Sequence, residues 1–168
     1  RRSSDLKQIS GAPKMCKGSQ PTGNFNVSEE ERQMLQQNHP ELMPYIRRFM
    51  GADEFLYDLP RYCFWLKEAS PNIIRRCPWL MNRIEDIKKQ REKSTKAATR
   101  KKAETPTLFD EDRQPDSDYL LVPSHSSENR EYIPSGFMTK DVICGNANLL
   151  VTDATLYHFG ILTSSLHM

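Results

Sequence analysis

The sequence lacks a long apolar run and a leader-like beginning. Its longest uninterrupted apolar stretch is Tyr62 to Leu66, whereas a membrane-spanning helix needs about 20 such residues, so we expect no transmembrane helix and no membrane partner. Arg1 to Ser10 are charged and polar, without the apolar core of a secretory signal, and the chain does not begin with Met. We therefore expect it to begin inside a larger protein.

Metal-binding patterns are missing as well. The four cysteines lie 47, 14 and 67 positions apart and the four histidines are equally scattered, so neither type forms the closely spaced pairs of a metal site or a disulfide scaffold. We expect no metal ion, and reduced thiols at Cys16, Cys63, Cys77 and Cys144. Because reduced thiols are typical of the cytoplasm, that is the predicted location.

The familiar catalytic motifs are also absent. The chain has no Gly-rich phosphate loop and no Gly-x-Ser-x-Gly nucleophile turn. His125 stands beside Ser126 and Ser127, but adjacent positions rarely give a nucleophile and its base the geometry they need. A hydrolase would have to depend on His125, and we expect no catalytic residue here. His158 lies in an apolar segment and is interpreted as a packed or capping residue.

The composition that is present predicts one folded domain. The 168 residues are 37% hydrophobic and 27% charged, which is polar but still globular. The predicted class is α+β, with a mixed β-sheet, short hairpins, packed helices and one long basic helix. Residues 1–26 are rich in Ser, Gly, Pro and Lys and are assigned to a linker, and residues 27–168 to the domain.

Local signals place the expected elements. Ser28 and Glu31 form a capping-box pattern that starts a short helix. Ser70 is the predicted N-cap of a second helix, and Pro78 opens a third, longer one. The other predicted elements are a helical piece over 41–49, a hairpin of 54–57 with 61–67, strands over 119–123 and 130–137, a strand pair of 142–144 with 149–151, and a helix over 154–162.

Charge is distributed unevenly along the chain. Between Lys88 and Lys102, eight Lys or Arg side chains accompany one acid, Glu92, so this segment has a charge of +7 within a chain of net charge +2. In the predicted long helix, basic residues recur at steps of 4, 3 and 4 and share one face. They are Lys89, Lys93, Lys96 and Arg100.

A basic helix end beside a polar strand and loop suits duplex DNA, which requires cations for phosphates and directional hydrogen-bond groups for base edges. Glu128 and Arg130 are two apart on a predicted strand and so point to one face, where Arg can donate to guanine and Glu can accept from cytosine. Each feature also has an ordinary interpretation, as a solvated helix end and an exposed ion pair.

A second hypothesis belongs to another functional class. In it the chain is a protein-interaction or scaffold module of a phage-defence complex, and the basic segment docks on an acidic partner. Asp110 to Asp112 suggest a related arrangement, in which these acids fold back over the basic helix of the same chain.

Several segments carry a family resemblance. They are KAATR at 96–100, TPTLF at 105–109, RQP at 113–115, HSSENREYIP at 125–134, IRRFMGADEF at 46–55, CFWLK at 63–67 and TLYHFG at 155–160. Together they resemble the target-recognition domain of the MmeI-like DNA methyltransferases, large bacterial proteins of type II restriction-modification systems. The likeness extends over nearly the whole chain.

The resemblance implies a partner and a reaction. Such proteins transfer a methyl group from S-adenosylmethionine to the exocyclic amine of adenine, and this chain would bind double-stranded DNA and the catalytic domain of its own polypeptide. The catalytic Asn-Pro-Pro-Tyr motif and the Gly-rich cofactor loop are absent. Catalysis and cofactor are therefore expected outside this chain, with residues 1–26 leading from the catalytic domain and Met168 as a truncation point.

The resemblance also implies residue roles. Base reading is expected from Glu128, Arg130 and Tyr132, and from one of two small residues, Ala97 or Ala98. Phosphate binding is expected from the basic residues of the predicted helix and from one loop serine. These residues are Lys89, Lys93, Lys96, Arg100, Lys101 and Ser126.

Overall fold

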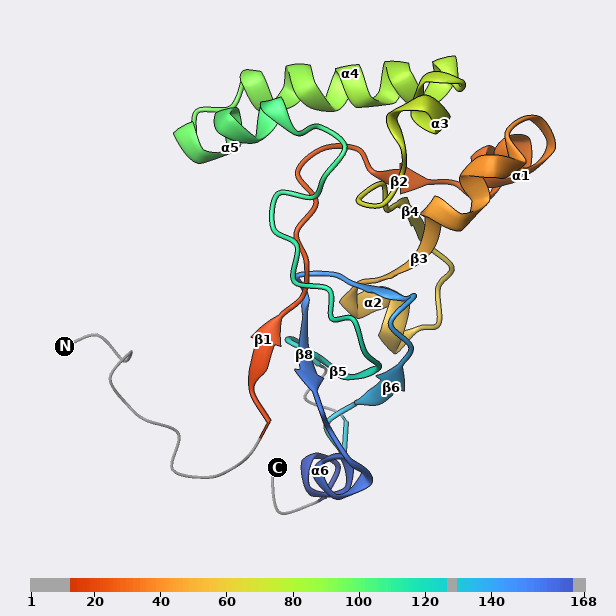
Figure 1. Cartoon of the computed structure of the whole chain (residues 1–168). Helices are drawn as coiled ribbons and strands as arrows, with labels where there is room; N and C mark the ends of the chain where they lie inside the picture. Colours follow the sequence, from red (N-terminus) through yellow and green to blue (C-terminus); the bar gives the residue numbers. More distant parts are fainter. Residues whose placement is uncertain (1–12, 127–129, 165–168) are drawn as a thin grey trace.

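The computed structural model describes residues 13–126 and 130–164 (Figure 1). Two four-stranded sheets and the surrounding helices form an α+β fold, which confirms the predicted class. The strands are β1 (Met15–Lys17), β2 (Asn26–Val27), β3 (Ile46–Met50), β4 (Tyr62–Phe64), β5 (Tyr119–Pro123), β6 (Gly136–Met138), β7 (Ile143–Cys144) and β8 (Asn148–Thr152). The α-helices are α1 (Glu29–Asn38), α2 (Ala52–Leu56), α3 (Pro71–Arg75), α4 (Pro78–Glu92), α5 (Ala97–Lys101) and α6 (Leu156–Leu162), and the 3-10 helices are η2 (Pro40–Tyr45) and η3 (Lys102–Glu104). No helix in this described part is long and apolar enough to cross a membrane.

One sheet has the strand order β1-β8-β5-β6, with all neighbours antiparallel. All five residues of β5 are buried, because this strand lies inside the sheet and is covered on both faces. A strand in that position carries a continuous apolar run instead of alternating residues. The predicted strand over 119–123 is therefore confirmed.

The other sheet has the order β2-β4-β3-β7, and β3 pairs with β7 in parallel. Its core also contains residues of α1, α3 and α4, and Figure 1 shows these helices together at one end of the molecule. Leu80, Ile84 and Ile87 of α4 are buried at helical spacing. The inward apolar stripe predicted for this helix is thus confirmed.

The two sheets are joined through the turn between β7 and β8. Asn148 is fully buried, and its Nδ2 donates to the Met50 carbonyl at 2.7 Å. The Gly145 backbone N–H donates to the same carbonyl at 2.9 Å. A side chain at Gly145 would overlap the ring of Phe49, so only glycine permits this close approach.

Two predictions in the first half of the chain are wrong. The helical piece over 41–49 is η2 only as far as Tyr45, and Ile46 begins strand β3. Residues 54–57 fall largely in helix α2, so they form no hairpin with 61–67, whose strand β4 pairs with β2 and β3. Short apolar runs do not show which period they follow, so partners elsewhere in the fold decide.

The strand pair predicted for 142–144 with 149–151 is also wrong in its pairing. Both segments contain strands, but β7 pairs with β3 in one sheet, and β8 pairs with β1 and β5 in the other. The Gly145 N–H that a hairpin would use locally donates to Met50 instead. The chain therefore changes sheets at this turn.

The described part of the predicted linker belongs to the fold. Within 13–26, β1 forms the edge of the first sheet, and Cys16 pairs with Leu150 of β8. Phe25 is only 2% exposed and packs against Phe109, with 4.9 Å between ring centroids. Residues 13–26 are therefore a structural segment of the domain, and residues 1–12 lie outside the described part.

Helix starts are the best-predicted features. The Ser28 Oγ accepts from the Glu31 N–H at 3.1 Å, and the Glu31 carboxylate accepts from the Ser28 N–H at 3.0 Å, which completes the predicted capping box. Ser70 caps α3, and Pro78 opens α4. His158 is a capping residue, because its Nδ1 accepts from the Thr155 N–H at 3.1 Å.

Candidate nucleic-acid interface

Arg91 anchors the basic segment to the core. Its side chain is fully buried, and its guanidinium donates to four backbone carbonyl oxygens. The acceptors are Thr22 at 2.8 Å, Lys102 at 2.9 Å, Thr105 at 3.0 Å and Leu108 at 2.7 Å. One of the eight cations in this segment is thus internal, and it ties the chain after α5 to α4 and to the segment before β2.

The single long basic helix is wrong, because α4 ends at Glu92 and α5 begins at Ala97. Lys96 is extended, with φ −82° and ψ 119°, and its N–H donates to the Ser94 Oγ at 3.2 Å. Serine and threonine side chains compete for backbone groups in this way and favour turns. Arg100 Nη1 also donates to the carbonyls of Ser94 and Thr95, at 2.8 and 2.9 Å.

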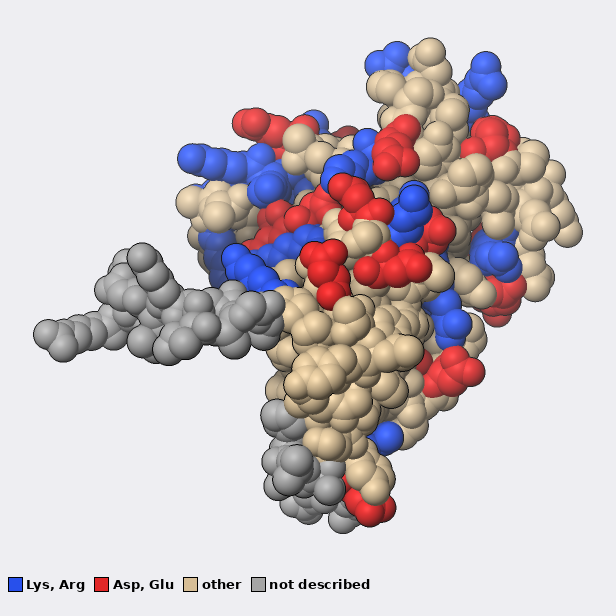
Figure 2. Space-filling model, turned by 60° about the horizontal axis from the view of Figure 1, so that its bottom comes forward, with Lys and Arg blue, Asp and Glu red and all other residues tan. Residues whose placement is uncertain are grey.

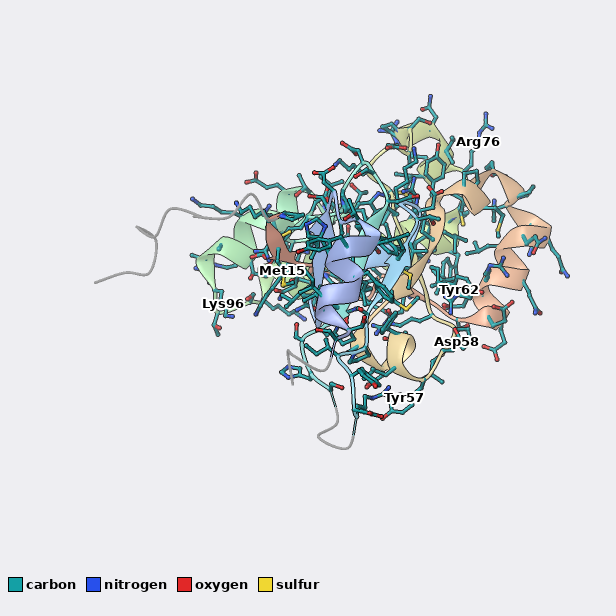
Figure 3. All side chains as sticks on the ribbon, turned by 90° about the horizontal axis from the view of Figure 1, so that it is seen from below. Met15, Tyr57, Asp58, Tyr62, Arg76 and Lys96 are labelled. Atoms are coloured by element: carbon teal, nitrogen blue, oxygen red, sulfur yellow. The ribbon has the colours of Figure 1, made fainter. Side chains whose placement is uncertain are left out.

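The expected phosphate-binding cations consequently lie on the end of α4, on the turn after it and on α5, and not on one face of one helix. Lys89 is on α4, Lys93 and Lys96 are in the turn, and Arg100 and Lys101 are on α5. All five are exposed. Figure 2 shows blue side chains projecting at the left of the view, on the α5 side, and Figure 3 places Lys96 at that edge.

Four of these five cations have no acidic partner among the described residues. Lys89 approaches Glu85 at 3.9 Å, but within the described chain Lys93, Lys96, Arg100 and Lys101 form no ion pair. The expected small residues Ala97 and Ala98 are exposed in the first turn of α5. The surface thus combines free positive charge with a backbone that a ligand can approach closely.

The acidic residues predicted to fold over the basic helix have other partners. The Asp112 carboxylate pairs with the Lys67 Nζ at 2.6 Å, and Glu111 pairs with Arg113 at 2.5 Å. The hydrogen bond and charge of Asp112 raise the pKa of the Lys67 ammonium. The predicted cover over the basic segment is therefore wrong for Glu111 and Asp112, whose ion pairs are with cations outside that segment.

The connection between β5 and β6 contains the other expected site residues. Ser126 is exposed, Arg130 is half-buried and Tyr132 is 49% exposed, with its hydroxyl donating to Glu131 Oε1 at 3.1 Å. The strand predicted over 130–137 is limited to β6, so Arg130 and Tyr132 lie in no strand, and the same-face argument made for Glu128 and Arg130 has no strand at Arg130 to support it. Pro134 has no N–H and interrupts strand pairing. Glu128 lies outside the described residues.

The structure places the two expected contact regions at different ends of the molecule. Figure 1 shows α5 beside the far end of α4, and the β5 and β6 strands at the other end, near α6. Phe55 of α2 lies against Gly136 of β6, and Figure 3 shows Tyr57, just after α2, well away from Lys96. A ligand that contacts both regions has to be long.

The buried titratable groups Cys63, Cys144 and Tyr119 are packed in the core. All four cysteines are free thiols, and burial raises the pKa of Cys63 and Cys144 to about 12, which keeps both thiols protonated and unreactive. Burial also raises the pKa of Tyr119, whose hydroxyl donates to the Val142 carbonyl at 2.6 Å. No cluster of His, Cys, Asp or Glu within the described residues has the arrangement of a metal site.

Sequence reasoning missed the positioning role of Arg91. It counted this residue among the surface cations, although the residue continues the buried spacing of Leu80, Ile84 and Ile87 along α4. That continuation is a weak signal, because three intervals of three or four residues also occur on solvated faces. Arg91 has a structural role only because the fold places the carbonyl groups of Thr22 and of residues in 102–108 next to its guanidinium.

Comparison with known proteins identifies the family. The family model described as "MmeI, target recognition domain" matches residues 3–168. The chain belongs to the MmeI target recognition domain family. This membership confirms the resemblance found in the sequence.

Two known proteins are similar to this chain. DNA methyltransferase A of Bacillus subtilis (strain 168) is 39% identical over 170 residues, covering 99% of this chain and 19% of that protein. A structure of the Type IIL restriction-modification enzyme MmeI, determined in complex with DNA, is 42% identical, with a TM-score of 0.89, covering 95% of this chain and 22% of that one. The chain thus spans about a fifth of each relative.

Proposed function

We propose that this domain binds duplex DNA and selects the sequence for a DNA methyltransferase whose catalytic domain lies elsewhere in a longer polypeptide. The observation that carries the proposal is the exposed cations around α5, which have no acidic partners among the described residues. Unpaired cations on a surface attract phosphates and release counterions from DNA. The relatives include a DNA methyltransferase and an enzyme solved with DNA.

The two regions of the surface have different roles in this proposal. Phosphate contacts from Lys89, Lys93, Lys96, Arg100 and Lys101, together with Ser126, set the register of the domain on DNA but carry no sequence information. Base edges are read by Glu128, Arg130 and Tyr132, and close to Ala97 or Ala98. Because the regions are far apart in Figure 1, they would contact different positions along the duplex.

The proposed reaction is methyl transfer from S-adenosylmethionine to the exocyclic N6 of adenine, after the adenine is flipped out of the duplex. The chain lacks a Gly-rich cofactor loop, so we assign no residue here to the cofactor. Catalysis and cofactor binding belong to the rest of the polypeptide. We place the protein in the bacterial cytoplasm, a reducing compartment suited to its free thiols.

The scaffold alternative is weaker than the DNA-reading proposal. It depends on the basic segment, which suits DNA equally, and in its related fold-back form Glu111 and Asp112 are engaged with Arg113 and Lys67 instead. The family and both relatives favour target recognition.

A salt titration tests the proposal. Full-length polypeptide containing this domain is mixed with labelled duplex, and the Kd is measured at several salt concentrations. Several phosphate contacts should make log K fall linearly with log salt, with a slope of about −0.9 per contact. Binding that is independent of salt would contradict the proposal.

A further inference from the structure

Helix α6 has one face packed against the domain and one without a partner among the described residues. Phe159 and Leu162 pack on a small buried cluster from the adjoining sheet. In contrast, Leu156 is 78% exposed, Tyr157 72% and Ile161 36%. Large apolar side chains at such exposure mark interaction surfaces when they lie side by side.

The exposed residues do lie side by side. Tyr157 and Ile161 are four positions apart, as are Leu156 and Gly160, so both pairs fall on one side of the helix. A Cβ added to Gly160 would meet no atom within 4 Å. These four residues therefore form a continuous apolar strip that no described residue covers, which we call the α6 strip.

The α6 strip differs in charge from the basic region around α5, although α6 adjoins the β5–β6 connection that holds the other expected DNA contacts. Figure 1 places α6 at the opposite end of the molecule from α5, and Figure 2, which turns this end forward, shows a largely tan area there. A phosphate backbone requires cations, whereas the centre of a protein–protein contact is apolar and depleted of charge. The strip therefore fits a protein surface and not DNA.

The size of the strip indicates which protein. From their exposed fractions, its three large side chains present on the order of 300–400 Å², about half of the ~800 Å² per partner in a stable interface between free proteins. A second copy or a separate protein would bind such a strip weakly. A partner on the same polypeptide needs less area, because tethering provides effective concentrations of about millimolar.

We propose that the α6 strip is the docking surface for another domain of the longer polypeptide that contains this one. Both relatives have about four-fifths of their length outside the matched region, so such domains are available to cover it. The inference goes beyond DNA reading and rests on the proposed function only for the longer polypeptide. Docking here would hold the domain in a fixed orientation to the rest of the enzyme.

Thiol labelling tests the proposal in the full-length polypeptide. Tyr157→Cys is reacted with a maleimide without DNA, and labelling of its peptide is followed by mass spectrometry, with the urea-unfolded protein as reference. Tyr57→Cys is the matched control, since Tyr57 is 66% exposed and lies away from α6. We expect the thiol introduced by Tyr157→Cys to label at least tenfold more slowly than the thiol introduced by Tyr57→Cys.

A second substitution makes the test specific. Adding Leu156→Asp should restore rapid labelling, because the charge opposes docking while a residue 78% exposed contributes little to the fold. Equal labelling at both positions overturns the proposal. So does protection that disappears on dilution, which indicates a second copy, or protection that appears only with duplex DNA. DNA affinity measured on the same samples tests the proposed function separately.

Discussion

The two regions proposed to contact DNA are built in different ways. The basic region around α5 is tied down by Arg91, whose guanidinium binds four carbonyl oxygens from two separate segments. The β5–β6 connection leaves the sheet at Pro123 and returns at Gly136, and of its described side chains Tyr132 bonds only to its neighbour Glu131. The first region is held in place by hydrogen bonds to the core, and the second is a connection between two strands with few such bonds among its described residues.

This difference suits the two proposed tasks. Phosphates recur at fixed spacing on every duplex, so a rigid set of cations can set the register regardless of sequence. Base edges change with sequence, and the exposed residues of a connection, unlike its Ile133, which packs on a buried cluster, can change without unfolding the domain. Substitutions of the basic residues in the α5 region should therefore affect stability and affinity, and substitutions of the expected base-reading residues in the β5–β6 connection should affect sequence preference.

The largest effect is expected from Arg91→Met. It leaves four backbone carbonyls without the guanidinium that donates to them in partly buried hydrogen bonds, and should lower the free energy of unfolding by about 3–5 kcal/mol. Urea denaturation measures the loss. Arg100→Met is the matched control, because Arg100 is exposed and its loss should cost less than about 1 kcal/mol. Equal effects of the two substitutions would show that the anchor is unimportant.

A change of sequence preference is expected from exchanging charge in the connection, with Glu128→Lys and Arg130→Asp together. Each base contact is worth about 1–3 kcal/mol of discrimination, enough to change the preferred base at one position. Modified-base sequencing of a methylation-free host expressing the full-length variant reads the result. If the methylated motif stays the same, these two residues do not read bases.

A smaller, uniform effect is expected from Lys96→Ala. Losing one phosphate contact should weaken binding to all duplexes alike and make the slope of log K against log salt shallower by about 0.9. Fluorescence anisotropy over a salt series measures both quantities. Glu85→Gln is a useful control, since it frees Lys89 from its acidic neighbour and should leave affinity equal or higher. A loss confined to one DNA sequence would assign Lys96 to base reading.

The smallest effect on stability is expected from Tyr132→Phe. Among the described residues the hydroxyl bonds only to the exposed Glu131, so the free energy of unfolding should change by less than about 0.5 kcal/mol. Thermal denaturation detects any larger change. A loss of about 1 kcal/mol or more would mean that side chains of the β5–β6 connection stabilise the fold, and the contrast with the α5 region would fail.

Prediction from sequence succeeded where the signal was local. The Ser28 and Glu31 capping box, the Ser70 cap and the Pro78 start each depend on groups within four residues, and all are present. It failed for 54–57, where four residues do not distinguish a strand from a helix. It also failed for β7 and β8, because adjacent strands can pair with distant ones.

The sequence by itself determined the composition of this protein, the starts of its helices, the concentration of cations over 88–102 and the segments that carry the family resemblance. The tertiary structure alone decided which of those cations reach solvent. Arg91 and Arg100 belong to the same basic segment, yet one is buried under four carbonyls and the other is exposed. The reason is physical: a guanidinium is buried only where the fold brings enough acceptors to it, and these acceptors come from residues 11 to 69 positions away.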